Sequence, residues 1–154
     1  MTTDHALPTA QELRKRLALT EAQKATEDAR RVAAAEAEKK ALLEQLSKPA
    51  GISVNEHMKR AAAVIERAVV NGQTEVFVTR FPHELCTDGG RAINQSERGW
   101  ENTLTGQPKE LYGFWDRHLR PLGYRLRVQI LDYPGGIPGD IGATLCWGDQ
   151  SLSA

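Results

Sequence analysis

Residues 124–147, YRLRVQILDYPGGIPGDIGATLCW, carry the clearest structural pattern in the chain. Apolar and polar side chains alternate over residues 124–130, as they do in a β-strand that buries one face. Residues 141–147 form a second apolar run, and the glycines and prolines between the two runs predict a loop. The stretch therefore predicts two antiparallel strands joined by a long connection.

The residues that precede this stretch predict the rest of a compact domain. A capping box at residues 53–56 starts a helix. Residues 75–80, EVFVTR, predict a third strand because they are rich in β-branched and aromatic side chains. A shorter helix is expected to begin at Pro82, and apolar spacing predicts another over 107–118. This order of elements predicts an α+β fold for residues 51–154: a small two-layer domain with a three-stranded sheet and helices packed on one face.

The N-terminal third of the chain has a different composition. Residues 9–48 contain no glycine, proline or aromatic residue and are rich in alanine, glutamate, lysine, arginine and leucine, which favour helices. A capping box formed by Thr9 and Glu12 starts the helix, and the sequence PAG at residues 49–51 ends it. Residues 1–49 are therefore predicted to form a separate unit, a long charged helix over residues 9–48 that is either coiled-coil-like or extended as an arm.

A thin apolar seam follows one side of this helix. Its members are Ala18, Ala22, Ala25, Ala29, Val32, Leu43 and Leu46, and it is interrupted by Glu36 and Lys39. Because alanine side chains permit close helix–helix approach, we expect residues 9–48 to mediate self-association into a homo-oligomer or docking of another protein. The alternative is a solvated single helix, because a charge-rich helix has only marginal stability alone.

The overall composition is that of a globular protein. The chain has 154 residues and a mass of 17.0 kDa, and 40% of its residues are hydrophobic, which excludes a wholly disordered chain. No apolar run approaches the roughly 20 residues of a membrane-spanning helix, and the N-terminus has no apolar signal core. Two cysteines are too few for a disulfide framework, so we expect a cytoplasmic protein without a membrane partner.

Residues 83–91, HELCTDGGR, contain the candidate catalytic set of a small enzyme: His83, Cys86, Asp88 and Arg91. On a helix His83 and Cys86 would share a face, which allows the imidazole to act as a base for the thiol. Asp88 would then orient the imidazole. The alternative is that Cys86 lies on the buried face of a short helix, as cysteine commonly does.

The same segment holds half of a metal-binding pattern. His83 and Cys86 have the spacing of a ligand pair, and Cys146 with His118 or His57 would complete four ligands. Structural zinc sites normally combine two tight pairs, and the sequence has only one. We therefore expect neither a metal nor a cofactor.

The polar positions of the strand at 124–130 form a second candidate site. On the outer face of the sheet we expect Arg125, Arg127 and Gln129, with Phe77, Thr79 and Thr144 beside them. Basic and aromatic residues on such a face can bind RNA, so nucleic-acid binding is an alternative function. The chain has 20 basic and 20 acidic residues and no RNA-module motif, so nucleic acid is not the expected partner.

The connection at residues 132–140, DYPGGIPGD, is the third candidate. Long ordered loops often carry function, and the candidate binding residues here are Asp132, Gly135, Gly136 and Asp140. The two aspartates can hold a cation or a substrate hydroxyl, or each can cap a turn beside a glycine. No phosphate loop, dinucleotide fingerprint, zinc-protease motif or nucleophile elbow occurs in the chain.

These patterns favour a non-enzymatic binding or assembly protein. In this interpretation the helix at residues 9–48 gathers copies or partners, and the α+β domain presents the recognition surface. The alternatives are a small cytoplasmic enzyme that uses the segment 83–91, and nucleic-acid binding through the outer face of the sheet.

Overall fold

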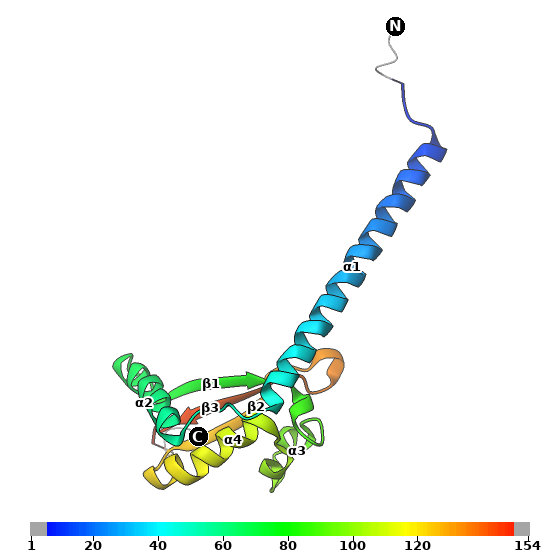
Figure 1. The fold of residues 1–154 in the computed structure, drawn as a ribbon. Coiled ribbons are helices and arrows are strands. Elements are labelled where there is room, and N and C mark those ends of the chain that lie inside the picture. The colour runs from blue at the N-terminus through cyan, green and yellow to red at the C-terminus, as the bar shows by residue number, and fades with distance from the viewer. Residues whose placement is uncertain (1–5, 150–154) are drawn as a thin grey trace. The chain divides into compact units, whose positions relative to one another are not determined.

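The computed structural model describes residues 6–149, and Figure 1 shows its helices and strands. Its contacts divide the chain into two compact units, Met1–Leu42 and Leu43–Ala154. This division falls before the composition change at residues 49–51, because Leu43 and Leu46 belong to the second unit and pack against its core.

The first helix, α1, extends without interruption over Ala10–Ser47 (Figure 1). Its start is fixed as predicted: the Glu12 N–H donates to the Thr9 hydroxyl at 3.1 Å, and the Thr9 N–H donates to the Glu12 carboxylate at 3.3 Å. No side chain of α1 is buried. The predicted long N-terminal helix is thus confirmed. Within residues 6–149, no helix combines the length and the apolar character needed to span a membrane.

The second unit is built on a three-stranded antiparallel sheet with the strand order β1–β3–β2. Its strands are β1 (Glu75–Phe81), β2 (Arg125–Ile130) and β3 (Ile141–Cys146). Every residue of the central strand β3 is buried. The structure confirms the predicted three-stranded sheet and the antiparallel pairing of its last two strands.

A β-bulge at Val78 interrupts β1. Phe77 lies opposite Thr144 of β3, and Thr79 lies opposite the next residue of β3, so Val78 has no partner. One extra residue moves the rest of a strand to the opposite face. The prediction that Thr79 shares the outer face with Phe77 is therefore wrong: Thr79 points towards the helices, and Arg80 occupies the outer position.

Helices cover the inner face of the sheet, which carries Phe81, Ile130 and Ile141. They are α2 (Val54–Val70), α3 (Arg91–Asn94) and α4 (Gly106–Phe114), and α4 continues as a π-helical turn over Trp115–Leu119. Short 3-10 turns occupy His83–Leu85, Trp100–Thr103, Arg120–Leu122 and Pro134–Gly136. The Trp115 indole N–H donates to the Tyr124 carbonyl at 3.0 Å, which joins the end of the α4 segment to the start of β2.

The core lies between the sheet and these helices. Its buried members are Phe81, Leu85, Cys86, Ile93, Leu104 and Ile141. Leu43 and Leu46, from the last turn of α1, pack against it. These two leucines belong to the predicted apolar seam, so the part of the seam that remains for a partner ends at Val32.

The segment after β1 is not the short helix predicted to begin at Pro82. It forms a 3-10 turn, a β-bridge at Cys86 and the single turn of α3. Gly89 and Gly90 have φ angles of 70° and 92°, which end a right-handed helix. A Cβ on Gly90 would lie 3.4 Å from the Ile141 side chain, so this glycine allows the turn to approach the core closely.

Candidate binding groove

The predicted catalytic segment is built into the core. Cys86 is only 4% exposed, and burial raises the pKa of its thiol to about 11, although a hydrogen bond with Thr103 acts in the opposite direction. A nucleophilic cysteine needs a thiolate near neutral pH. The surroundings of Cys86 favour the neutral thiol and give no support to nucleophilic catalysis.

The other three residues of that segment have structural partners. His83 lies 2.6 Å from the carboxylate of Glu84, and Arg91 lies 2.9 Å from that of Glu97. The Asp88 carboxylate accepts hydrogen bonds from two backbone N–H groups of the following turn. Burial acts to raise the pKa of Asp88, but these hydrogen bonds outweigh it and lower the pKa. Asp88 therefore caps the turn rather than orienting His83.

We expect Cys86 to react with iodoacetamide near neutral pH only when the native structure opens. The thiol is neutral and covered by core side chains, so its labelling rate should rise steeply once urea unfolds the protein. Mass spectrometry of the peptide that contains Cys86 separates it from Cys146. Rapid labelling of Cys86 in the folded protein would instead favour the enzyme hypothesis.

The proposed metal ligands do not assemble into a site. Within residues 6–149, no group of three or more histidine, cysteine, aspartate or glutamate side chains is placed to hold a metal ion. Cys86 belongs to the core under the sheet, whereas Cys146 lies opposite Glu75 and Arg125, on the outer face.

The arginines on the outer face of the sheet interact with other residues of the chain. Arg127 reaches across the central strand, and its guanidinium lies 2.8 Å from the carboxylate of Glu75. The hydrogen bond from Arg127 lowers the pKa of Glu75. Arg125 donates to the Gly148 carbonyl at 2.9 Å, and Gln129 is exposed at the edge of the same face. The two arginines expected to recognise a ligand are therefore engaged within the chain.

The aspartates of the 132–140 connection also have a partner within the chain. Arg80 lies 2.7 Å from the Asp140 carboxylate and 3.3 Å from that of Asp132. The bulge in β1 makes this possible because it turns Arg80 outward. Gly135 and Gly136 are exposed, with φ angles of 65° and 82°, in a 3-10 turn of this connection. The two aspartates thus bind a positive charge, but this charge is the guanidinium of Arg80 and not a bound ion.

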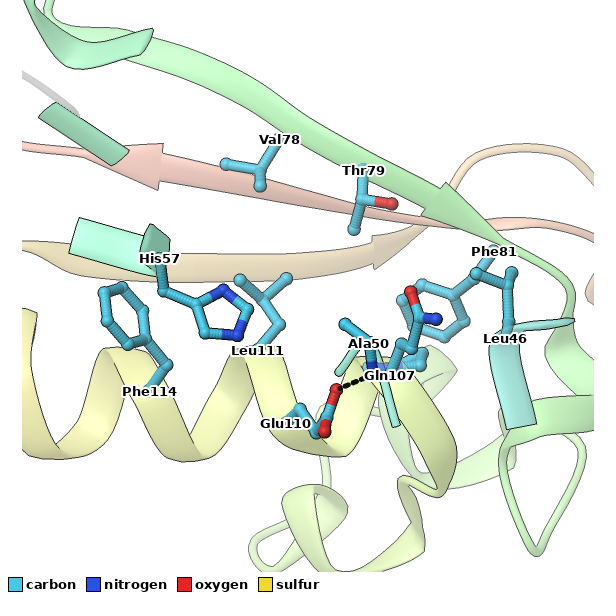
Figure 2. A pocket seen from close by; sticks show the side chains of 11 residues that line it. Leu46, Ala50, His57, Val78, Thr79, Phe81, Gln107, Glu110, Leu111 and Phe114 are labelled. Carbon is cyan, nitrogen blue, oxygen red and sulfur yellow. Dashed lines mark hydrogen bonds between the residues drawn. The ribbon is translucent and has the colours of Figure 1, made fainter. Parts of the chain in front are cut away.

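A groove lies on the other side of the sheet, between α2, α4 and β1. Three concavities meet in it, and His57 of α2 and Phe114 of α4 line all three. Figure 2 shows one of them, where Val78 and Thr79 of β1 point towards Leu111 of α4. We refer to the space lined by His57, Val78, Leu111 and Phe114 as the α2–α4 groove.

The middle of the α2–α4 groove is apolar. Its volume is about 340 Å³, within the range of small-molecule sites. Its apolar lining includes Val64, Phe77, Val78, Leu111, Phe114, Trp115, Leu119, Leu126 and Leu145. The space remains open because α2 buries only Ala68 completely and presents small side chains, such as Ala61, to the groove.

One end of the groove is polar. Two imidazoles lie near the Phe114 ring, with centroid distances of 5.4 Å for His57 and 5.3 Å for His118. Lys109 and Arg117 line the same end. Glu110 is its one acidic lining residue, and its carboxylate accepts the Ala50 N–H at 3.1 Å (Figure 2).

Sequence reasoning does not locate this groove. It considers His57 and His118 as metal ligands and His118 also as part of a basic stretch, and it assigns no role to Lys109 or Phe114. A usable signal does exist, because a lysine, a glycine and an arginine recur at intervals of four along residues 109–117. That spacing places all three on one side of a helix.

Comparison with protein-family models, with curated proteins and with solved structures finds no match.

Proposed function

We propose that this is a non-enzymatic binding and assembly protein, in which α1 gathers copies of the chain and the α+β unit presents a binding surface. One observation carries the proposal: none of the side chains from Ala10 to Leu42 is buried, although they form a single uninterrupted helix. A helix in water depends mainly on packing of an apolar face for its stability. A second helix would supply that packing.

The exposed surface of α1 offers apolar groups for this purpose. Leu17, Leu19 and Val32 are each more than half exposed. Ala18, Ala22, Ala25 and Ala29 lie along one side, where small side chains allow two helices to approach closely. Complete burial of an exposed leucine or valine contributes about 1.5–3 kcal/mol. These side chains are already partly covered, so each contributes less, and several such contacts along the helix are needed to hold two copies together.

Light scattering after size exclusion tests the proposal. We expect the full chain to form an oligomer at tens of micromolar and a chain that begins at Leu43 to be a monomer. The truncation begins at Leu43 rather than at residue 51 because Leu43 and Leu46 pack against the core of the second unit. A monomeric full chain would overturn the proposal.

A matched pair of substitutions locates the interface on α1. A29E places a charge in the alanine seam, whereas A34E places the same charge on the opposite side of the helix. Both positions are exposed, and both changes replace alanine with another good helix former. We expect A29E to dissociate the oligomer and A34E to leave it intact. Equal effects of the two changes would show that the seam is not the interface.

A further inference from the structure

The polar end of the α2–α4 groove contains cations that no carboxylate neutralises. In the described part of the chain, neither Lys109 nor Arg117 has an ion-pair partner. By contrast, five arginines of the same unit lie within 3.3 Å of an aspartate or glutamate. Glu110 at this end is hydrogen-bonded to the backbone N–H of Ala50. The concavity therefore has an excess of positive charge.

Lys109 and Arg117 lie on either side of Gly113, a position that carries no side chain. Lys109, Gly113 and Arg117 follow one another at intervals of four, so they share one side of the helical segment. Gly113 has no side chain, and a Cβ built there would meet nothing within 4 Å. The backbone at Gly113 is thus open to a ligand, and both long cationic side chains can reach over it.

The second wall of this concavity supplies further donors. His57 from α2 and His118 both line it, and the ring of each lies close to that of Phe114. An imidazole carries at least one N–H donor in either protonation state. The volume is about 400 Å³, which suits a small organic molecule.

We propose that this end of the groove binds a small phosphorylated molecule. The phosphate lies over Gly113 between Lys109 and Arg117, with His57 and His118 as additional donors. A phosphate has enough charge and acceptor atoms to satisfy several donors at once, and its hydrogen bonds to charged groups are strong. The volume of the concavity, about 400 Å³, favours a small ligand over a nucleic acid or a membrane surface. The site lies wholly in the second unit and does not depend on assembly through α1.

Amide NMR of the full chain tests the site directly. Glycerol phosphate and acetate are titrated separately at constant ionic strength. We expect glycerol phosphate to shift the Gly113 amide signal with saturation in the millimolar range, and acetate to bind about tenfold more weakly because it carries less charge. R117A should weaken glycerol phosphate binding by about tenfold or more. Shifts that do not saturate, or that follow surface lysines and arginines throughout the chain, would overturn the proposal.

Two changes at Gly113 separate loss of binding from loss of folding. G113E places a carboxylate four residues from both Lys109 and Arg117, where it can pair with each. It should abolish phosphate binding while raising the melting temperature by roughly 3 °C or more, because glycine is a poor helix former. G113A gives a similar gain in helix stability without the charge. Its single added methyl group should weaken glycerol phosphate binding less than the carboxylate of G113E does.

Two further outcomes would contradict the proposal. One is that G113E binds glycerol phosphate as well as the natural chain does. The other is that a single-stranded oligonucleotide, or vesicles containing phosphatidylglycerol, bind through Arg117 while glycerol phosphate does not. That result would assign the cations to a macromolecular surface.

Discussion

Replacing Ile141 with alanine is expected to lower the free energy of unfolding by about 3–5 kcal/mol. Ile141 has no exposed surface and lies in the central strand, opposite Phe81 on one side and Ile130 on the other. A Cβ built on Gly90 would lie 3.4 Å from the Ile141 side chain, which places this side chain close to the turn at Gly90. Removal of three carbon atoms leaves a cavity at a point where two strands and a turn meet, so the surroundings cannot close around it easily.

Urea unfolding followed by tryptophan fluorescence measures this loss. Ile137→Ala is the matched control, because Ile137 is 65% exposed in the connection between β2 and β3. The control should change the free energy of unfolding by less than about 0.5 kcal/mol. Similar losses at the two positions would show that Ile141 does not have the central role that its burial indicates.

Replacing Gly106 with alanine is expected to cost about 2–4 kcal/mol. Gly106 has a φ angle of 61°, which disfavours any residue with a Cβ. The added Cβ would overlap the carbonyl oxygen of Leu46 and lie 2.8 Å from the Cα of Ser47. Both neighbours are backbone atoms, so neither can rotate away. The last turn of α1 would have to move from its place on the core.

Gly135→Ala provides the control for the backbone angle. Gly135 has a similar φ angle of 65°, but a Cβ there would meet nothing within 4 Å. It should therefore show only the cost of the positive φ angle, about 1 kcal/mol. The difference between the two variants in urea unfolding measures the close packing of α1 at Gly106. Equal losses would mean that this packing contributes little.

The sequence predicts the elements whose signals are local. Alternation over residues 124–130 identifies β2, and the composition of residues 9–48 identifies α1. The capping box at Thr9 and Glu12 locates the start of α1 within a residue. Each of these signals depends on the residue's own neighbours in sequence, so no tertiary contact is needed to interpret them.

The features that the sequence does not predict depend on contacts between distant residues. The bulge at Val78 is defined by the register of β1 against β3, and the residues of β1 alone contain no sign of it. Leu43 and Leu46 continue the α1 seam in sequence, yet they pack against the core. The α2–α4 groove exists because residues far apart in the sequence, such as His57 and Phe114, lie close together. The alternation of side chains and the composition of a segment contain no information about such contacts between distant residues.

The two edges of the sheet bear on whether this protein aggregates through its strands. β1 and β2 are the outer strands, and the unpaired backbone groups of an edge strand can recruit a strand from another molecule. The bulge at Val78 disturbs the hydrogen-bonding row of β1, and Arg125 and Arg127 place charge on β2. Irregular and charged edges are poor templates for a further strand. If several copies associate through α1, the local concentration of these strand edges rises. The bulge in β1 and the arginines of β2 would then restrict association to the helices and disfavour pairing of strands from different copies into fibrils.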